Sequence, residues 1–212
     1  MRTYLVLVCS ILIVFSAYGQ SESSELWSGY TLKFKINKKW RAELEQQIRA
    51  TDQLQGIRSA FAEMGVRYKI TDYLNLKPQL RYSVNNGQRN EFRFSLDANV
   101  EWNFKKWNLR PKYRFRFQNT TVDYTGENKT LLRNQFELAH NLSRPVDPYV
   151  EYENFYRLNL KNEVRNHRYT FGLEWKLNRD IDLKTFIRAD REVNIKRPDK
   201  QNILGLELSF DL

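Results

Sequence analysis

Four basic residues occupy alternate positions near the middle of the chain: Arg110, Lys112, Arg114 and Arg116. Side chains two positions apart on a β-strand point to the same face, so a strand here would carry all four cations in one row. One interpretation of this row is an anion-attracting strip along a pore. The other is a charge network that fills a narrow lumen, because small barrels are usually filled by their own side chains. The acids that would neutralise the row from neighbouring strands are Asp97, Glu101 and Glu137.

Two histidines, His140 and His167, are the remaining residues with catalytic potential. A lipid hydrolase or acyltransferase needs a nucleophile with a base within hydrogen-bond reach. His140 shares its predicted strand face with Leu138 and Leu142, and His167 stands at the start of a predicted strand. Neither has a serine on the same face of an adjacent strand, and no metal-ligand spacing, phosphate loop or dinucleotide fingerprint occurs. The sequence therefore predicts a protein that is not an enzyme and that holds no metal or cofactor.

The segment 92–104, just before the basic row, alternates between apolar and polar side chains at every position. A period of two predicts a β-strand with one apolar face and one polar face. At roughly 3.3 Å per residue this strand would span about 40 Å, longer than an ordinary strand. When it is tilted, its apolar band matches the hydrocarbon layer that an outer-membrane strand crosses. We therefore predict a membrane-spanning strand here.

The same alternation recurs along the whole chain. Short polar turns alternate with longer polar segments, a layout typical of an outer-membrane barrel whose long loops lie outside the cell. We therefore predict that residues 20–212 form an all-β, transmembrane, antiparallel up-and-down β-barrel of ten to twelve strands. The predicted strands are 30–36, 40–48, 60–70, 74–84, 92–104, 107–117, 132–142, 148–156, 169–177, 181–189 and 204–212. The predicted long loops lie near residues 50–58, 85–91, 118–130, 157–167 and 192–202.

These segments add up to eleven strands, whereas bacterial single-chain barrels have an even number. Residues 20–27 could hide part of another strand, the first segment could sit in the barrel mouth, or one strand could have been split in two. The last segment, 204–212, ends on an apolar residue with an aromatic residue two positions before it. In this it resembles the terminal strand by which outer-membrane barrels are recognised for insertion.

The first 19 residues have the pattern of a cleaved signal peptide. Arg2 provides a positive charge, residues 4–15 form an apolar core, and Ala17 and Gly19 place small residues before a cleavage site at Gln20. The formal net charge of the chain is +10, which could suit a nucleic-acid-binding protein, but a secretion signal argues against that partner. The expected partners are outer-membrane lipids, lipopolysaccharide phosphates and small anions.

Hairpin geometry predicts which charges meet across the strands. A two-residue turn at Lys105 and Lys106 would place Glu101 opposite Arg110 and Asp97 opposite Arg114. Similar turns give the pairs Lys176 with Asp182, Glu174 with Lys184, Lys33 with Glu43 and Glu63 with Arg81. Lys35 with Arg41 and Arg67 with Lys77 come out as like-charged pairs, which need acids from a further strand or an anion. The predicted lumen-lining residues are Asp97, Glu101, Arg110, Lys112, Arg114, Arg116, Glu174, Lys176, Asp182 and Lys184.

Two further groups of residues mark the ends of the predicted barrel. Aromatic residues near strand ends indicate an interfacial girdle: Trp40, Tyr73, Trp102, Trp107 and Trp175. Basic residues in the predicted long loops form an outer rim that could hold lipopolysaccharide phosphates or carry solvated charge: Lys161, Arg165, Arg168, Lys196, Arg197 and Lys200.

Several short motifs resemble one family. They are the opening Leu26-Trp27-Ser28-Gly29, the turn Asn37-Lys38-Lys39-Trp40, the end of a return strand from Glu45 to Arg49, Val66-Arg67-Tyr68-Lys69 followed by Leu80-Arg81-Tyr82, and Ile203-Leu204-Gly205-Leu206. The family is a group of uncharacterised secreted proteins from Gram-negative bacteria known as domain of unknown function 2490. The resemblance implies an outer-membrane location and supplies no activity, ligand or catalytic residue.

The sequence therefore predicts a non-enzymatic bacterial outer-membrane barrel. This barrel would be either structural or a narrow, anion-preferring pore with a charge-lined lumen. Two alternatives stay open. One is an outer-membrane lipid-modifying hydrolase or acyltransferase, and the other is a soluble secreted barrel that binds a small apolar ligand inside. The second alternative has the same alternation with the two faces reversed.

Overall fold

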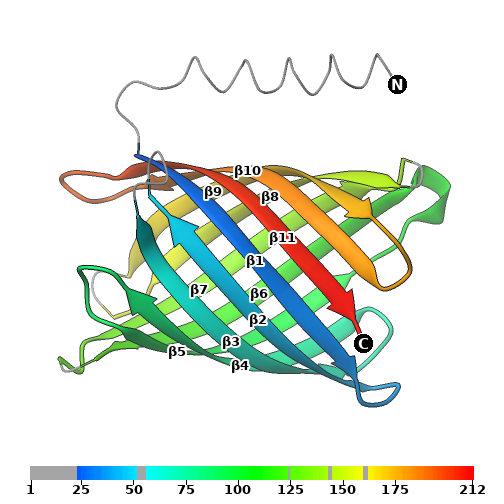
Figure 1. Ribbon diagram of the computed structural model, residues 1–212, viewed down its shortest axis with the longest axis horizontal. Helices are drawn as coiled ribbons and strands as arrows, with labels where there is room; N and C mark the ends of the chain where they lie inside the picture. The colour runs from blue at the N-terminus through cyan, green and yellow to red at the C-terminus, as the bar shows by residue number, and fades with distance from the viewer. Residues whose placement is uncertain (1–22, 52–55, 124, 143–144, 160–161) are drawn as a thin grey trace, which may run out of the picture.

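The computed structural model describes residues 23–51, 56–123, 125–142, 145–159 and 162–212. The predicted signal peptide, residues 1–19, lies outside the described residues. Within them the chain forms a closed β-barrel (Figure 1). No helix in the described part is long and apolar enough to span a membrane. The strands are β1 (Ser23–Lys35), β2 (Trp40–Ala50), β3 (Ile57–Lys69), β4 (Leu74–Asn85), β5 (Glu91–Glu101), β6 (Leu109–Val122), β7 (Asn128–His140), β8 (Val146–Arg157), β9 (Glu163–Lys176), β10 (Ile181–Glu192) and β11 (Lys200–Asp211).

The barrel has eleven strands, and the predicted all-β barrel of ten to twelve strands is confirmed. Consecutive strands are antiparallel, but β1 and β11 close the barrel as a parallel pair. An odd number of alternating strands can close only in this way, because the first and last strands then run in the same direction. Residues from Ser23 onward lengthen β1 and do not form part of another strand.

Because β1 and β11 are parallel, the start of β1 and the end of β11 lie at opposite ends of the barrel. β1 begins at the end where the long loops lie, and β11 ends beside the β1–β2 turn (Figure 1). The backbone N–H of Lys35 donates to the carbonyl of Leu212, and the N–H of Leu212 donates to the carbonyl of Lys33. The last residue is therefore tied to the short-turn end of β1.

The strands extend beyond the predicted segments on the long-loop side. β6 continues to Val122 and β9 begins at Glu163, so the loops between strands are shorter than the sequence indicated. The added residues are mostly polar, which hides them from a search for apolar alternation. Their backbone groups can still pair with a neighbouring strand, since pairing depends on the backbone and not on the side-chain pattern.

Apolar and polar side chains are distributed over the two faces of the wall in the reverse of the arrangement in a soluble protein. Large apolar side chains lie exposed on the outside; Phe94 exposes 39% of its surface and Leu206 exposes 41%. Many of the buried side chains are polar or charged, among them Glu153 and Ser95, each 1% exposed. A soluble barrel that encloses an apolar ligand would need the opposite arrangement, so the structure disfavours that alternative.

The turn between β5 and β6 differs from the predicted two-residue turn. Lys105–Trp107 forms a 3₁₀ turn, η2, and Asn108 adopts the left-handed conformation with φ of 52°. Left-handed backbone is uncommon outside glycine but tolerated by asparagine. The longer connection shifts the register by two residues relative to the prediction.

The predicted pairs Asp97–Arg114 and Glu101–Arg110 are therefore wrong: Asp97 lies opposite Arg116, and Glu101 lies opposite Lys112. A shift of two residues leaves every side chain on its predicted face. The four other predicted opposite-charge pairs are confirmed by the strand registers: Lys176 with Asp182, Glu174 with Lys184, Lys33 with Glu43, and Glu63 with Arg81.

Candidate functional site

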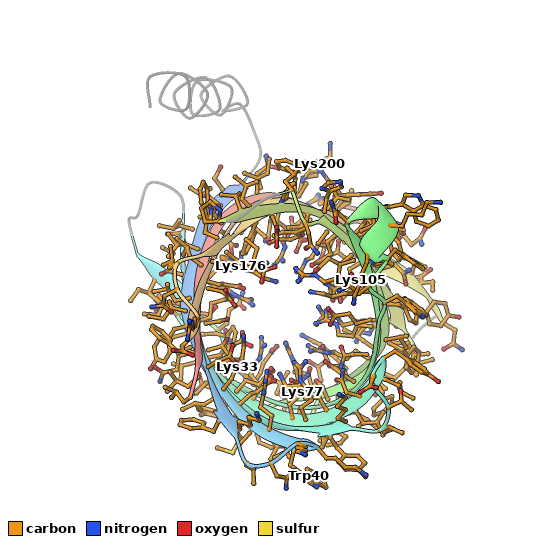
Figure 2. The ribbon with its side chains drawn as sticks, turned by 90° about the vertical axis from the view of Figure 1, so that its right-hand side faces the viewer. Lys33, Trp40, Lys77, Lys105, Lys176 and Lys200 are labelled. Carbon is orange, nitrogen blue, oxygen red and sulfur yellow. The ribbon has the colours of Figure 1, made fainter. Side chains whose placement is uncertain are left out.

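The inner wall of the barrel surrounds a cavity of about 530 Å³. Figure 2 looks along the barrel, with Lys33, Lys77 and Lys176 on the inner side of the ribbon and Trp40 outside it. The inward side chains leave the centre of this view open. The residues that line the cavity include twelve lysines and arginines and eight carboxylates. The lumen is therefore charged and carries an excess of positive side chains.

The structure places the ten predicted lumen residues in two groups. Six line the cavity itself: Asp97, Glu101, Lys112, Arg114, Arg116 and Lys184. The other four stand on the same strand faces nearer the short-turn end: Arg110, Glu174, Lys176 and Asp182. In this second group the guanidinium of Arg110 donates to Glu174 at 2.8 Å.

A dense ion-pair network crosses the middle of the wall from β6 to β9. The carboxylate of Glu153 accepts hydrogen bonds from Arg114 at 2.8 Å and from Arg133 at 3.0 and 2.8 Å. A third guanidinium, that of Arg168, lies 3.6 Å from it. One fully buried carboxylate thus holds three cations from three strands, an arrangement in which the charges compensate each other's desolvation.

A second buried pair extends the network to β4 and β5. Asp97 receives two parallel hydrogen bonds from Arg116, at 2.6 and 2.7 Å, and one from Gln79 at 3.1 Å. Bidentate guanidinium–carboxylate pairs of this kind are among the strongest polar contacts in proteins. They fix the positions of the side chains that narrow the lumen.

Acids from other strands contact members of both predicted like-charged pairs. Glu43 on β2 contacts Arg67 at 2.9 Å and Lys77 at 2.7 Å. At the short-turn end, Asp211 on β11 lies 3.4 Å from Arg41. Acids on a further strand, one of the two possibilities that the sequence left open, therefore supply the counter-charge.

The long-loop half of the lumen contains a cluster of arginines stacked on aromatic rings, which was not predicted from the sequence. Trp27 on β1 faces inward and is 4% exposed. The Cζ atoms of Arg49, Arg188 and Arg168 lie 3.9, 5.2 and 5.5 Å from the centroid of its ring. Two phenylalanines repeat the arrangement: Arg81 lies 3.5 Å from the ring of Phe61, and Arg133 lies 4.3 Å from the ring of Phe155.

A signal for this cluster was present in the sequence. Trp27 has the same parity as Lys33 on β1, and Phe61 has the same parity as Glu63 on β3. Both aromatic residues are therefore on the polar, inward face. The predicted first strand began only at residue 30, which left Trp27 outside it, and the prediction of inward residues was confined to charged side chains.

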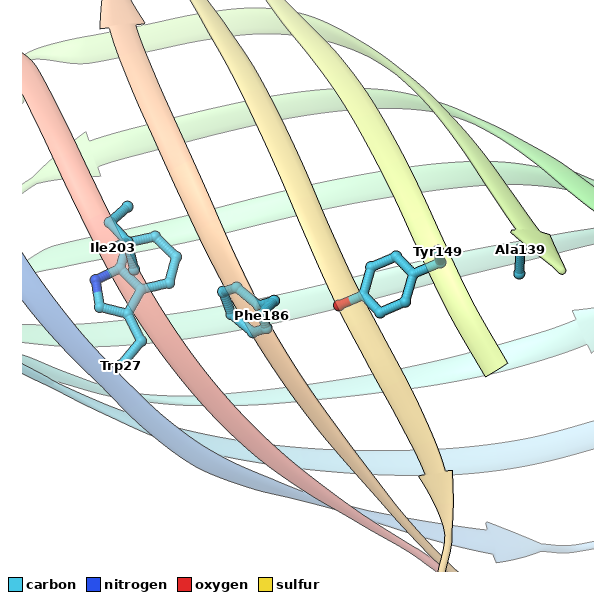
Figure 3. Packing of buried hydrophobic residues seen from close by; sticks show 5 residues of the cluster. All are labelled: Trp27, Ala139, Tyr149, Phe186 and Ile203. Atoms are coloured by element: carbon cyan, nitrogen blue, oxygen red, sulfur yellow. The ribbon is translucent and has the colours of Figure 1, made fainter. Parts of the chain in front are cut away.

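Two inward aromatic rings, those of Phe186 and Tyr149, pack against the wall over glycines. Trp27, Phe186 and Tyr149 form a row with the smaller side chains of Ile203 and Ala139 (Figure 3). The ring of Phe186 covers Gly205, and the ring of Tyr149 covers Gly172, so closely that a Cβ atom at either glycine would overlap the ring. Packing of an aromatic ring over a glycine on the next strand keeps the rings out of the lumen.

The family model described as "Protein of unknown function (DUF2490)" matches residues 24–201. The chain belongs to the DUF2490 family. No curated protein matches it.

This DUF2490 chain is similar to solved porin structures. The NanC porin aligns with a TM-score of 0.51 and 13% identity, over 79% of this chain and 87% of that one. The KdgM porin gives a TM-score of 0.47 and 11% identity over 80% and 84% of the two chains. A complex of the KdgM porin with disordered oligogalacturonate gives 0.47 and 12% identity over the same shares. The similarity to the NanC porin shows a porin-like β-barrel.

The two histidines of the DUF2490 barrel have different hydrogen-bond surroundings. The Nδ1 atom of His167 lies 2.8 Å from the hydroxyl of Tyr152, and the two rings are stacked. The Nδ1 atom of His140 has no hydrogen-bond partner among the described residues. No histidine–serine hydrogen bond occurs within the described part of the chain, nor any cluster there of three or more metal-ligating residues.

The predicted basic rim needs one correction. Arg168 lies inside the barrel, where its guanidinium donates twice to Asp190 at 2.6 Å, because β9 begins earlier than predicted. Arg165 lies near the long-loop end of β9, 3.1 Å from Glu163. Lys161 lies outside the described residues.

Proposed function

We propose that this DUF2490 chain is a non-enzymatic, narrow pore in the outer membrane of a Gram-negative bacterium, and that the pore prefers anions. The charge of the wall carries the proposal: twelve cationic side chains and eight carboxylates surround one cavity. A low-dielectric passage lined by an excess of one sign concentrates ions of the other sign. Rings of arginine and lysine give anion pores their selectivity.

The outer surface supports the membrane location. Exposed tryptophans gather at the short-turn end, with Trp40 at the start of β2 and both Trp102 and Trp107 in the β5–β6 connection. Tyr73, in the neighbouring β3–β4 turn, is 54% exposed. Aromatic residues at this level are typical of the boundary between lipid tails and head groups. We expect outer-membrane lipids to contact this surface and lipopolysaccharide to surround the long-loop end.

Single-channel recording of the purified protein in planar bilayers tests the proposal. We expect discrete conductance steps, and under a salt gradient a reversal potential whose sign shows that chloride permeates more readily than potassium. A reversal potential that favours potassium would contradict the anion preference. Membrane fractionation of the producing cells, with mass spectrometry of the mature N-terminus, tests the location and the cleavage before Gln20.

A structural barrel with a closed lumen is the second candidate. The carboxylates of Asp97 and Glu153 are saturated by guanidiniums from neighbouring strands, as expected of a wall that fills its own interior. This candidate predicts a protein in the membrane fraction that gives no conductance steps at any voltage that the bilayer tolerates. Regular steps in repeated recordings would exclude it.

A further inference from the structure

We infer that the long-loop half of the lumen holds a binding site for the carboxylate group of an organic solute, formed by Arg49 and Arg188 against the indole of Trp27. All three residues line the cavity. The inference deepens the proposed pore function, because a solute would reach the site through the lumen.

The indole of Trp27 is a fixed platform for the two guanidiniums. Its Nε1 donates a hydrogen bond to the Oε2 atom of Glu25 at 2.8 Å, and the side chain is almost fully buried. Arg49 lies 3.9 Å and Arg188 lies 5.2 Å from the ring centroid. Both distances are within the range of cation–π attraction, about 6 Å from the ring centroid. The ring therefore holds two long, flexible side chains in one place.

In the described part of the chain, only some of the guanidinium N–H groups of these two arginines donate hydrogen bonds. The Nε of Arg49 donates to Gln47 at 3.0 Å, and within the described part of the chain no carboxylate lies within 4.0 Å of Arg49. The Nε of Arg188 donates to Thr170 at 2.9 Å, and its Nη2 lies 3.8 Å from the Oε1 atom of Glu151, beyond hydrogen-bond distance.

A third arginine at the same ring, Arg168, differs because a carboxylate accepts hydrogen bonds from its guanidinium. Arg168 lies 5.5 Å from the centroid of Trp27, yet both of its donor directions are used by the carboxylate of Asp190, at 2.6 Å each. Arg49 and Arg188 stand beside it with no equivalent partner among the described residues. Three cations thus meet at one ring with one tightly bound carboxylate, and the two arginines without such a partner line the cavity.

The chemistry of the open forks identifies the class of ligand. A guanidinium presents two parallel N–H groups that match the two oxygens of a carboxylate, one oxygen for each N–H, whereas chloride is a single spherical acceptor with no second atom to match the fork. The rings support the guanidiniums without neutralising them, so the positive charge stays available to the solute. We therefore expect a carboxylate to bind here in preference to chloride.

Two measurements on the full-length mature protein test the site, with sodium succinate as the probe and sodium chloride at equal ionic strength as the reference. The first is thermal unfolding in detergent, where ligand binding raises the melting temperature. The second is succinate block of the chloride current in planar bilayers. The first readout does not need an open pore, so failure of the site and failure of the proposed pore are distinguishable.

We expect the double variant R49Q/R188Q to weaken the succinate effect about tenfold or more in both measurements. R49K keeps the charge and removes the planar fork, so we expect it to lose the preference for succinate over chloride while the current stays anionic. Lys112→Gln is the matched control, because it removes one charge from the same cavity on a side chain already paired with Glu137 at 2.9 Å. It should keep the succinate effect.

The inference is overturned if wild type shows no stabilisation by succinate beyond that of chloride. It is also overturned if R49K, or the double variant, responds like wild type, or if Lys112→Gln weakens succinate as much as the double variant does. Succinate stabilisation of a barrel that never conducts would support the site and contradict the pore.

Discussion

The two halves of the lumen differ in how some of their cations are held. In the short-turn half, each of three lysines lies within 3 Å of a carboxylate: Lys77 with Glu43, Lys112 with Glu137, and Lys176 with Asp147. In the long-loop half, arginines lie on buried rings, among them Arg49 and Arg188 on Trp27. A carboxylate positions a cation and cancels its charge, whereas a ring positions it and leaves the charge in place. Among the ring-stacked arginines of the long-loop half, Arg49 and Arg188 are those whose charge no carboxylate within hydrogen-bond distance cancels in the described part of the chain.

The largest expected effect on stability comes from replacing Glu153, the buried carboxylate that three arginines share. Replacement of Glu153 by Gln leaves Arg114, Arg133 and Arg168 close together without their shared carboxylate. Loss of one member of a buried ion pair typically destabilises a protein by about 3–5 kcal/mol. We expect a clearly lower melting temperature in detergent, followed by circular dichroism.

The control for Glu153→Gln is Glu101→Gln, because Glu101 is half exposed and lies 3.9 Å from Arg110. Its melting temperature should stay close to that of wild type, since exposed pairs contribute about 0–1 kcal/mol. Equal melting temperatures for the two variants would show that the network around Glu153 does not hold the wall together.

The next largest effect tests the aromatic supports. In Gly205→Val the added side chain would overlap the ring of Phe186, which must leave the wall. Overpacking of this kind costs about 1–3 kcal/mol. Because Arg188 lies 4.4 Å from that ring, the displacement should also disturb the conductance. Gly56→Ala is the control, because nothing lies within 4 Å of a Cβ atom there. A Gly205→Val barrel as stable as the control would mean that the ring packs elsewhere at no cost.

The smallest effect is expected in the short-turn half. Lys33→Gln removes a cation 4.0 Å from Asp211, and that carboxylate keeps Arg41 at 3.4 Å. Partly exposed pairs contribute about 0–1 kcal/mol, so the melting temperature and the ion preference should barely change. A change in ion preference as large as that of an arginine variant on Trp27 would remove the distinction between the two halves.

Local pattern predicted much of this architecture. Alternation around residues 92–104 identified the strand type, and short turns fixed the register of Glu63 with Arg81 and of Glu174 with Lys184. These features depend on residues close in sequence. Side-chain parity also survived the error at the β5–β6 turn, because the register moved by two residues.

Other features depend on contacts between distant segments. Nothing near Ser23 or Lys200 indicates that β1 and β11 pair in parallel. The platform at Trp27 needs arginines from β2, β9 and β10, which meet only when the barrel closes. A division of residues into apolar and polar does not indicate this platform, because the aromatic ring of Trp27 lies on the polar, inward face.

The central claim is that the interior is a wet, positively charged passage and that lipid covers the outside. Because the single cysteine of the chain, Cys9, lies in the predicted signal peptide, cysteines can be placed one at a time in the mature barrel. The direct measurement is the rate at which anionic and cationic water-soluble thiol reagents modify Gln135→Cys, on the cavity wall, and Phe94→Cys, on the outer face, in liposomes. We predict rapid modification at position 135, faster for the anionic reagent, and none at position 94. Modification at 94 but not at 135, or a faster cationic reagent at 135, would contradict the account.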